Sequence, residues 1–241
     1  MTPAGAQPWN GPPGRRFTVL SRARPDHRTS YFQVNRGVSR CRPASGAVDM
    51  ADCGAKGYGR PMLLDAQRSA LVVVDVQERL APAMDGGAAV EARCSVLMRA
   101  AARLDIPVIV SEQYPKGLGP TVPALAALTP PGAVIAKTAF SCMGEPAFAA
   151  RISALGRDQF IVCGIEAHVC VLQTALALAA AGQQVAVVED AVGSRRPSDK
   201  AAALRRLDRA GVTIVTSEMA VFEWLGRAGT PAFKDLSALI R

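Results

Sequence analysis

Three side chains that can do nucleophilic chemistry follow short apolar runs in this chain of 241 residues. Asp75 follows residues 70–74, Lys137 follows 133–136, and Cys170 lies soon after 160–163. Together they supply an attacking sulfur, a carboxylate that can take its proton, and a cation that stabilises negative charge. Their types and placement predict a nucleophile site built from Asp75, Lys137 and Cys170.

Each of these residues also has a simpler interpretation. An aspartate after a strand often caps a turn, a lysine there is usually solvated, and Cys170 can be a small buried apolar residue. The strand order of a doubly wound sheet decides between the two interpretations. In the order 3-2-1-4-5-6 the first and fourth strands are neighbours at the switch point, so Asp75 and Cys170 would face each other.

The stretch from Phe160 to Asp190 reads as strand, turn, helix, turn and strand. Such a unit implies a parallel sheet with a right-handed crossover. We expect its helix to run from about His168 to Ala181 and to end at Gly182. Cys170 would then lie in the first helical turn, where the unpaired N–H groups and the helix dipole favour a thiolate and predict a lowered pKa.

Strands and helices alternate from Met62 onward, which predicts an α/β fold. We expect three layers around a doubly wound, mostly parallel sheet of six strands. The expected strands cover 70–74, 107–110, 133–136, 160–163, 184–188 and 212–215. Longer helices are expected at 88–104, 145–155, 168–181, 198–210 with Ser198 as the N-cap, and 217–225. The segment 111–120 reads as a polar loop.

The positive charge of the chain is concentrated in its first 61 residues. Residues 1–61 contain ten Lys/Arg and three Asp/Glu, whereas residues 62–241 contain 18 and 17. The first segment is also rich in Gly, Pro and Ser, which predicts a disordered N-terminal extension, although an upstream addition or a targeting segment stays open. Residues 62–241 form the predicted domain, and their balanced charge gives no reason to expect nucleic acid as a partner.

Cysteine and histidine usage narrows the remaining classes. The six cysteines include no C-x-x-C pair, which suits reduced thiols in the cytoplasm better than a disulfide framework or a zinc site. Two histidines leave little for a histidine-based metal site, so we expect no metal and no cofactor. No apolar run reaches the eighteen residues of a membrane span, so we expect no membrane partner.

Four motifs give the chain a family resemblance: LVVVDVQERLAPAM, VSEQYPKGLGPTVPAL, KTAFSCM, and the stretch that begins GIEAHVCVLQTAL. In this order they resemble the isochorismatase-like cysteine hydrolases, most closely the YcaC-like and isochorismatase-domain-containing proteins. The resemblance covers about Met62 to Arg241. It implies a triad of Asp75, Lys137 and Cys170 and a homo-oligomeric assembly.

The resemblance also implies how a substrate would be held. A non-proline cis peptide is expected at Ile165–Glu166, and the amides of Glu166 and Cys170 would form an oxyanion hole. Gln77, Gln113 and Ile165 would line the substrate pocket.

One departure from the wider superfamily concerns metal. Nicotinamidases carry histidine ligands near the second strand, but SEQYPKG contains none. Isochorismatases themselves usually lack the cysteine. The sequence therefore predicts a metal-independent hydrolase that converts a small amide, or a related carbonyl compound, through a thioester acyl-enzyme. The alternatives are a catalytically silent relative that binds a metabolite, and a redox sensor that pairs Cys170 with Cys142 or Cys163.

Overall fold

Six parallel strands form the centre of the molecule in a computed structural model that describes residues 62–240. Their order is β3-β2-β1-β4-β5-β6, as the sequence predicted. The strands are β1 (Ser69–Val74), β2 (Val108–Gln113), β3 (Val134–Lys137), β4 (Gln159–Ile165), β5 (Gln184–Gly193) and β6 (Thr213–Val215). The prediction made for residues 1–61 falls outside the described part of the chain.

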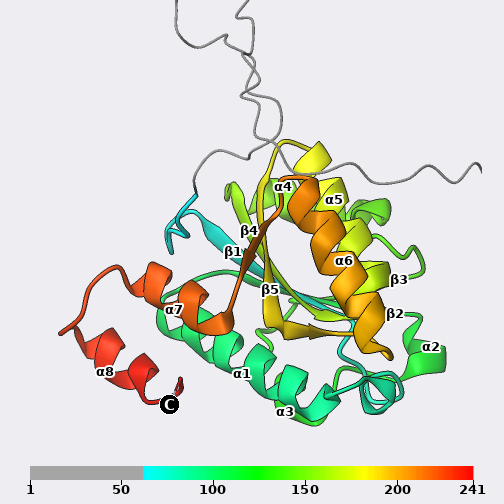
Figure 1. Cartoon of the computed structure of the whole chain (residues 1–241), viewed down its shortest axis with the longest axis horizontal. Coiled ribbons are helices and arrows are strands. Elements are labelled where there is room, and N and C mark those ends of the chain that lie inside the picture. Colours follow the sequence, from blue (N-terminus) through cyan, green and yellow to red (C-terminus); the bar gives the residue numbers. More distant parts are fainter. Residues whose placement is uncertain (1–61, 241) are drawn as a thin grey trace, which may run out of the picture. The chain divides into compact units, whose positions relative to one another are not determined.

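Helices cover both faces of this sheet, which gives the three expected layers (Figure 1). The longer ones are α1 (Gly87–Arg103), α4 (Pro146–Ala154), α5 (Leu172–Ala180), α6 (Pro197–Arg209), α7 (Ser217–Leu225) and α8 (Pro231–Ser237). Short helical turns are η2 (Ala81–Ala83), α2 (Pro115–Leu118), α3 (Pro123–Ala126), η3 (Cys142–Gly144) and η4 (Ala167–Val171). None of the helices within residues 62–240 has the length and hydropathy of a membrane span.

Strand β1 shows why the apolar runs are continuous. Leu71 and Val73 pack with α1, α3, α7 and α8 on one face, while Val72 and Val74 pack with α4, α5 and α6 on the other. A strand that is buried on both faces has no polar alternation, so its sequence reads as unbroken Val and Leu. The two cores fix the strand ends, and with them the candidate site.

Glycines allow the closest backbone approaches. Gly182 and Gly211 have φ angles of 82° and 83° just after α5 and α6, which confirms the predicted helix ends. Gly164 in β4 has φ 110°, and a Cβ there would lie 2.1 Å from the carbonyl oxygen of Val74. Any side chain at this position would therefore push β4 away from β1, next to Asp75.

Several boundaries differ from the sequence prediction. Strand β2 continues through the polar residues 111–113, because their backbones still pair with β1 or β3, so the predicted loop begins three residues too early. Strand β5 extends to Gly193 in the same way. Ser198 is not the N-cap of α6, since the helix begins at Pro197 with Arg196 as its N-cap. Proline suits the first helical position, because its missing N–H would have no partner there.

Candidate active site

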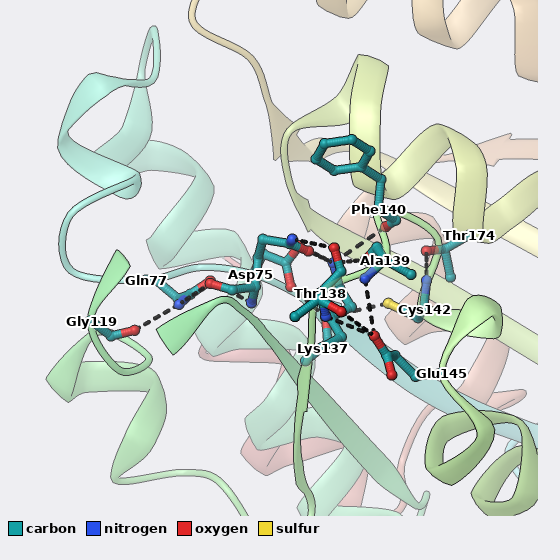
Figure 2. Close-up of polar contacts among 12 residues, drawn as sticks. Asp75, Gln77, Gly119, Lys137, Thr138, Ala139, Phe140, Cys142, Glu145 and Thr174 are labelled. Carbon is teal, nitrogen blue, oxygen red and sulfur yellow. Dashed lines mark hydrogen bonds and ion pairs between the residues drawn. The ribbon is translucent and has the colours of Figure 1, made fainter. Parts of the chain in front are cut away.

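Two strand ends bring a buried ion pair together. Asp75 follows β1 directly, and Lys137 is the last residue of β3. The Nζ atom of Lys137 donates to Oδ2 of Asp75 at 2.7 Å, and neither side chain has any exposed surface (Figure 2). The backbone of Asp75 takes a φ of 52°, a region that asparagine and aspartate occupy more readily than most side chains. The structure therefore brings together two of the three residues of the predicted site.

The ammonium of Lys137 lies within hydrogen-bond distance of four acceptors. Besides Asp75, it donates to Oε1 of Gln113 at 2.5 Å and to the carbonyl oxygens of Ala139 and Phe140 at 3.2 and 3.3 Å. Burial alone would lower the pKa of Lys137, but the charge of Asp75 and the hydrogen bond to it outweigh burial and raise the pKa. Lys137 is thus a fixed cation and is unsuited to releasing a proton.

A second chain of hydrogen bonds reaches the other oxygen of Asp75. Ser111 Oγ, on the polar end of β2, donates to Asp75 Oδ1 at 2.7 Å. The thiol of Cys142 lies 3.4 Å from the same serine oxygen. The backbone N–H of Cys142 donates to Thr174 Oγ1 at 2.9 Å. Both carboxylate oxygens are therefore held, so the carboxylate has a fixed orientation. The sequence did not identify Ser111, and it named Cys142 only as a redox partner of Cys170 and not as part of this network.

Cys170 lies in η4, a π-helical turn between β4 and α5, and not in the first turn of an α-helix. Its pKa is raised to about 12, mainly because the thiol is buried and also because Asp75 is negatively charged, while Lys137 acts in the opposite direction. The expected lowering of this pKa is therefore wrong, since the sequence argument counted the helix terminus but neither burial nor the carboxylate. The resting form of Cys170 is the thiol.

The turn before Cys170 contains the expected cis peptide bond between Ile165 and Glu166. The carbonyl oxygen of Glu166 accepts from the N–H groups of Val169 and Val171. Arg195 holds the Glu166 carboxylate through Nε at 3.0 Å. The oxyanion hole of Glu166 and Cys170 stays a prediction.

The three residues expected to line a substrate pocket differ in their surroundings. Gln77 is fully buried and bonds to the backbones of Gln113 and Gly119, so it holds two segments together. Gln113 is half-buried, and its side chain bonds to Lys137 and to the carbonyl oxygen of Thr138. Ile165 is buried in the core. Substrate contact by these residues stays a prediction.

Metal ligands are sparse in this region. The described residues contain no group of three or more His, Cys, Asp and Glu side chains placed to hold a metal ion. His168 is turned toward the loop after β5, with Nδ1 3.0 Å from Ser194 Oγ. The carboxylate of Asp75 is already paired with Lys137.

Residues 69–219 match the model of the Isochorismatase domain family, which is more than half of the chain. The protein belongs to the isochorismatase family. It therefore has the hydrolase fold of that family, and the candidate site lies inside the matched region.

Relatives from animals match most of this isochorismatase-family chain. Isochorismatase domain-containing protein 2 of Danio rerio is 39% identical over 186 residues, which cover 76% of this chain and 91% of the relative. Isochorismatase domain-containing protein 2A of Mus musculus is 36% identical over 180 residues, which cover 73% and 84%.

Solved structures of the same fold carry different descriptions. A protein of Caenorhabditis elegans described as MAR1 ribonuclease superposes with a TM-score of 0.70 at 38% identity, covering 74% of this chain and 92% of that one. YcaC of Escherichia coli, described as an octameric hydrolase of unknown specificity, superposes with a TM-score of 0.71 at 25% identity, covering 75% and 92%.

Proposed function

We propose that this isochorismatase-family protein is a cysteine hydrolase of small amides or related carbonyl compounds. The observation that carries the proposal is the buried Asp75–Lys137 pair, whose two charges both act on the thiol of Cys170. A carboxylate beside a thiol with a raised pKa is suited to take the proton as sulfur attacks, because no preformed thiolate is then needed.

The first half-reaction would proceed through a tetrahedral intermediate. Sulfur of Cys170 bonds to the substrate carbonyl carbon as its proton moves to Asp75. The N–H groups of Glu166 and Cys170 would stabilise the oxyanion. When the C–N bond breaks, Asp75 returns the proton to the departing nitrogen, which leaves a thioester on Cys170 and a free amine or ammonia.

The second half-reaction would reuse the same carboxylate. Asp75 takes a proton from water as the oxygen attacks the thioester carbon. The C–S bond then breaks, the thiolate regains the proton from Asp75, and the carboxylic acid leaves. Lys137 keeps its proton throughout and offsets the negative charge that passes between Asp75 and Cys170.

A panel of small amides, assayed for ammonia or amine release, tests this proposal. Wild type should turn over at least one amide and, after an acid quench, should carry an acyl mass on the peptide that contains Cys170. The variant Cys170→Ala should do neither. Cys94→Ala, a change of the same kind on the buried face of α1, should behave as wild type. Full turnover by Cys170→Ala would contradict the proposal.

The name of the nematode relative suggests RNA as another substrate class. The fully buried pair of Asp75 and Lys137 and the balanced charge of residues 62–241 favour a small substrate over a polyanion. The same preparation incubated with single-stranded RNA separates the classes. RNA cleavage that is lost in Cys170→Ala, without amide turnover, would replace the amide proposal.

Of the two cysteine pairs considered for a redox sensor, the structure favours only Cys170 with Cys142. Cys142 and Cys170 pack in the same core and both interact with Asp75 and Lys137, whereas Cys163 packs on the opposite face of the sheet. A sensor would therefore pair Cys170 with Cys142. A loss of two hydrogens after mild peroxide, mapped to these two residues, would favour this function over hydrolysis.

We further propose that the protein acts in the cytoplasm as a homo-oligomer and needs no metal. The octameric description of YcaC supports self-association. The segment 111–117, which has no histidine, supports chemistry without metal. Sedimentation at micromolar concentration should show an assembly larger than the monomer, and a monomer alone would contradict this part of the proposal.

A further inference from the structure

The loop of residues 138–140 is held by a single carboxylate. Oε1 of Glu145 accepts from the backbone N–H of Thr138 at 2.7 Å, from that of Ala139 at 3.0 Å, and from the Thr138 hydroxyl at 3.2 Å (Figure 2). The carbonyl oxygens of Ala139 and Phe140 in this loop accept from the ammonium of Lys137. One face of the loop thus binds Glu145, and the other binds the lysine of the candidate site.

The backbone of Glu145 is anchored at the start of α4. Its carbonyl oxygen accepts from Phe148 and Ala149 at the start of α4, and Phe148 is buried against the sheet. Glutamate is not among the preferred N-cap residues, and this side chain makes no capping bond to α4. It turns instead to the loop, which passes so close that a Cβ on Gly144 would lie 2.9 Å from the Ala139 side chain.

The structure assigns Glu145 as a positioning residue that fixes the 138–140 loop and thereby holds the ammonium of Lys137 against Asp75. The pKa of Glu145 is lowered, first by the N–H of Ala139 and then by that of Thr138, so the contact is present at neutral pH and is lost as the pH falls through the lowered pKa. The turnover part of this inference rests on the proposed function, whereas the part that concerns the thiol does not.

Two substitutions separate geometry from charge. Glu145→Ala removes both the acceptor and the charge, while Glu145→Gln keeps an acceptor of the same length and removes only the charge. If Glu145 acted through its charge, both variants would favour the Cys170 thiolate and speed its alkylation. If Glu145 positions the loop, alanine should slow alkylation, because Lys137 then stabilises the thiolate less, and glutamine should restore it.

The measurement is the rate at which iodoacetamide modifies Cys170 at pH 9, followed by peptide mass spectrometry on the full chain. We expect Glu145→Ala to lower this rate at least about three-fold and to lower turnover at least about ten-fold, since misplacement by about 1 Å can cost up to 10²-fold. Glu145→Gln should stay within about two-fold of wild type. The control Glu218→Ala, an exposed glutamate on α7, should change neither rate.

Melting temperatures separate positioning from loss of fold. The inference is overturned if folded Glu145→Ala alkylates and turns over as wild type does, or if alanine and glutamine speed alkylation equally. Should Glu145→Ala fail to fold, Glu145→Asp, whose shorter side chain cannot span the same gap without moving the loop, takes its place with the same expected direction. Slower alkylation without any wild-type amide turnover would retain the positioning role and reject the hydrolase proposal.

Discussion

Replacing Asp75 with asparagine should make Cys170 easier to ionise while stopping turnover. Asparagine matches aspartate in size and tolerates the φ of 52° at this position, so it removes the charge with little backbone change. The carboxylate is one of the two largest causes of the raised pKa of Cys170, and Lys137, which lowers that pKa, remains in place. The sign is therefore fixed: without the negative charge, the pKa of the thiol falls.

The magnitude follows from charge separation and thiol reactivity. A unit charge about 4 Å away contributes about 4 kcal/mol at an effective dielectric constant of 20, which is about three pKa units and an upper bound here. Each unit of fall raises the thiolate population about ten-fold but lowers the nucleophilicity of that thiolate about three-fold. We therefore expect alkylation of Cys170 at pH 8 to become about ten-fold faster, whereas turnover falls by about 10²-fold or more.

The assay follows iodoacetamide labelling of Cys170 from pH 7 to 10. In wild type the rate should climb about ten-fold per pH unit without a plateau, because the pKa of about 12 lies above this range. The variant should be faster at every pH. Asp190→Asn serves as the control, because that carboxylate on β5 bonds to Ser217. Labelling of folded Asp75→Asn at the wild-type rate, or slower, would refute the reasoning.

Four further outcomes can be measured. Lys137→Met should lower the free energy of unfolding in urea by about 3–5 kcal/mol, because the charge of Asp75 stays buried without its partner; a loss below 1 kcal/mol would argue against the pair. Gln77→Ala should lower it by about 1–3 kcal/mol, since buried backbone groups of Gln113 and Gly119 lose their partners. Dialysis against a chelator should leave turnover unchanged, and a stoichiometric metal lost together with activity would contradict this. A chain that begins at Met62 should keep the melting temperature and turnover of the full chain, whereas a fall of many degrees would move the domain boundary.

The parts of the fold that were predictable share one cause. Strands buried on both faces leave unbroken apolar runs, so β1, β3, β4 and β6 were located within about two residues. The polar ends of β2 and β5 were missed, because residues such as Ser111 and Asp190 resemble loop residues in sequence while their backbones continue the strand. The site uses the polar end of β2, where Ser111 bonds to Asp75 and Gln113 accepts from Lys137.

The candidate site was most predictable where a polar residue directly follows an apolar run. Asp75 and Lys137 both do so, and the structure joins them. Ser111 contacts a residue that is distant in the sequence, and Glu145 contacts a neighbouring loop; no local sequence pattern marks such contacts. The predicted lowering of the Cys170 pKa was wrong for a related reason. Burial and the carboxylate of Asp75, 95 positions away in the chain, raise this pKa more than the helix terminus lowers it.

The strand order has a consequence for refolding. Asp75 and Lys137 are separated by 62 residues, and the central pairing of β1 with β4 joins segments that lie farther apart still. Contacts between residues so far apart in the sequence form late, because the chain loses the entropy of a long loop before it gains the stabilising contacts. Helix content should therefore return before thiol reactivity does when the denatured chain is diluted into buffer. The reactivity of the Cys170 thiol thus reports when the sheet has finished assembling, and it can be measured without knowledge of any substrate.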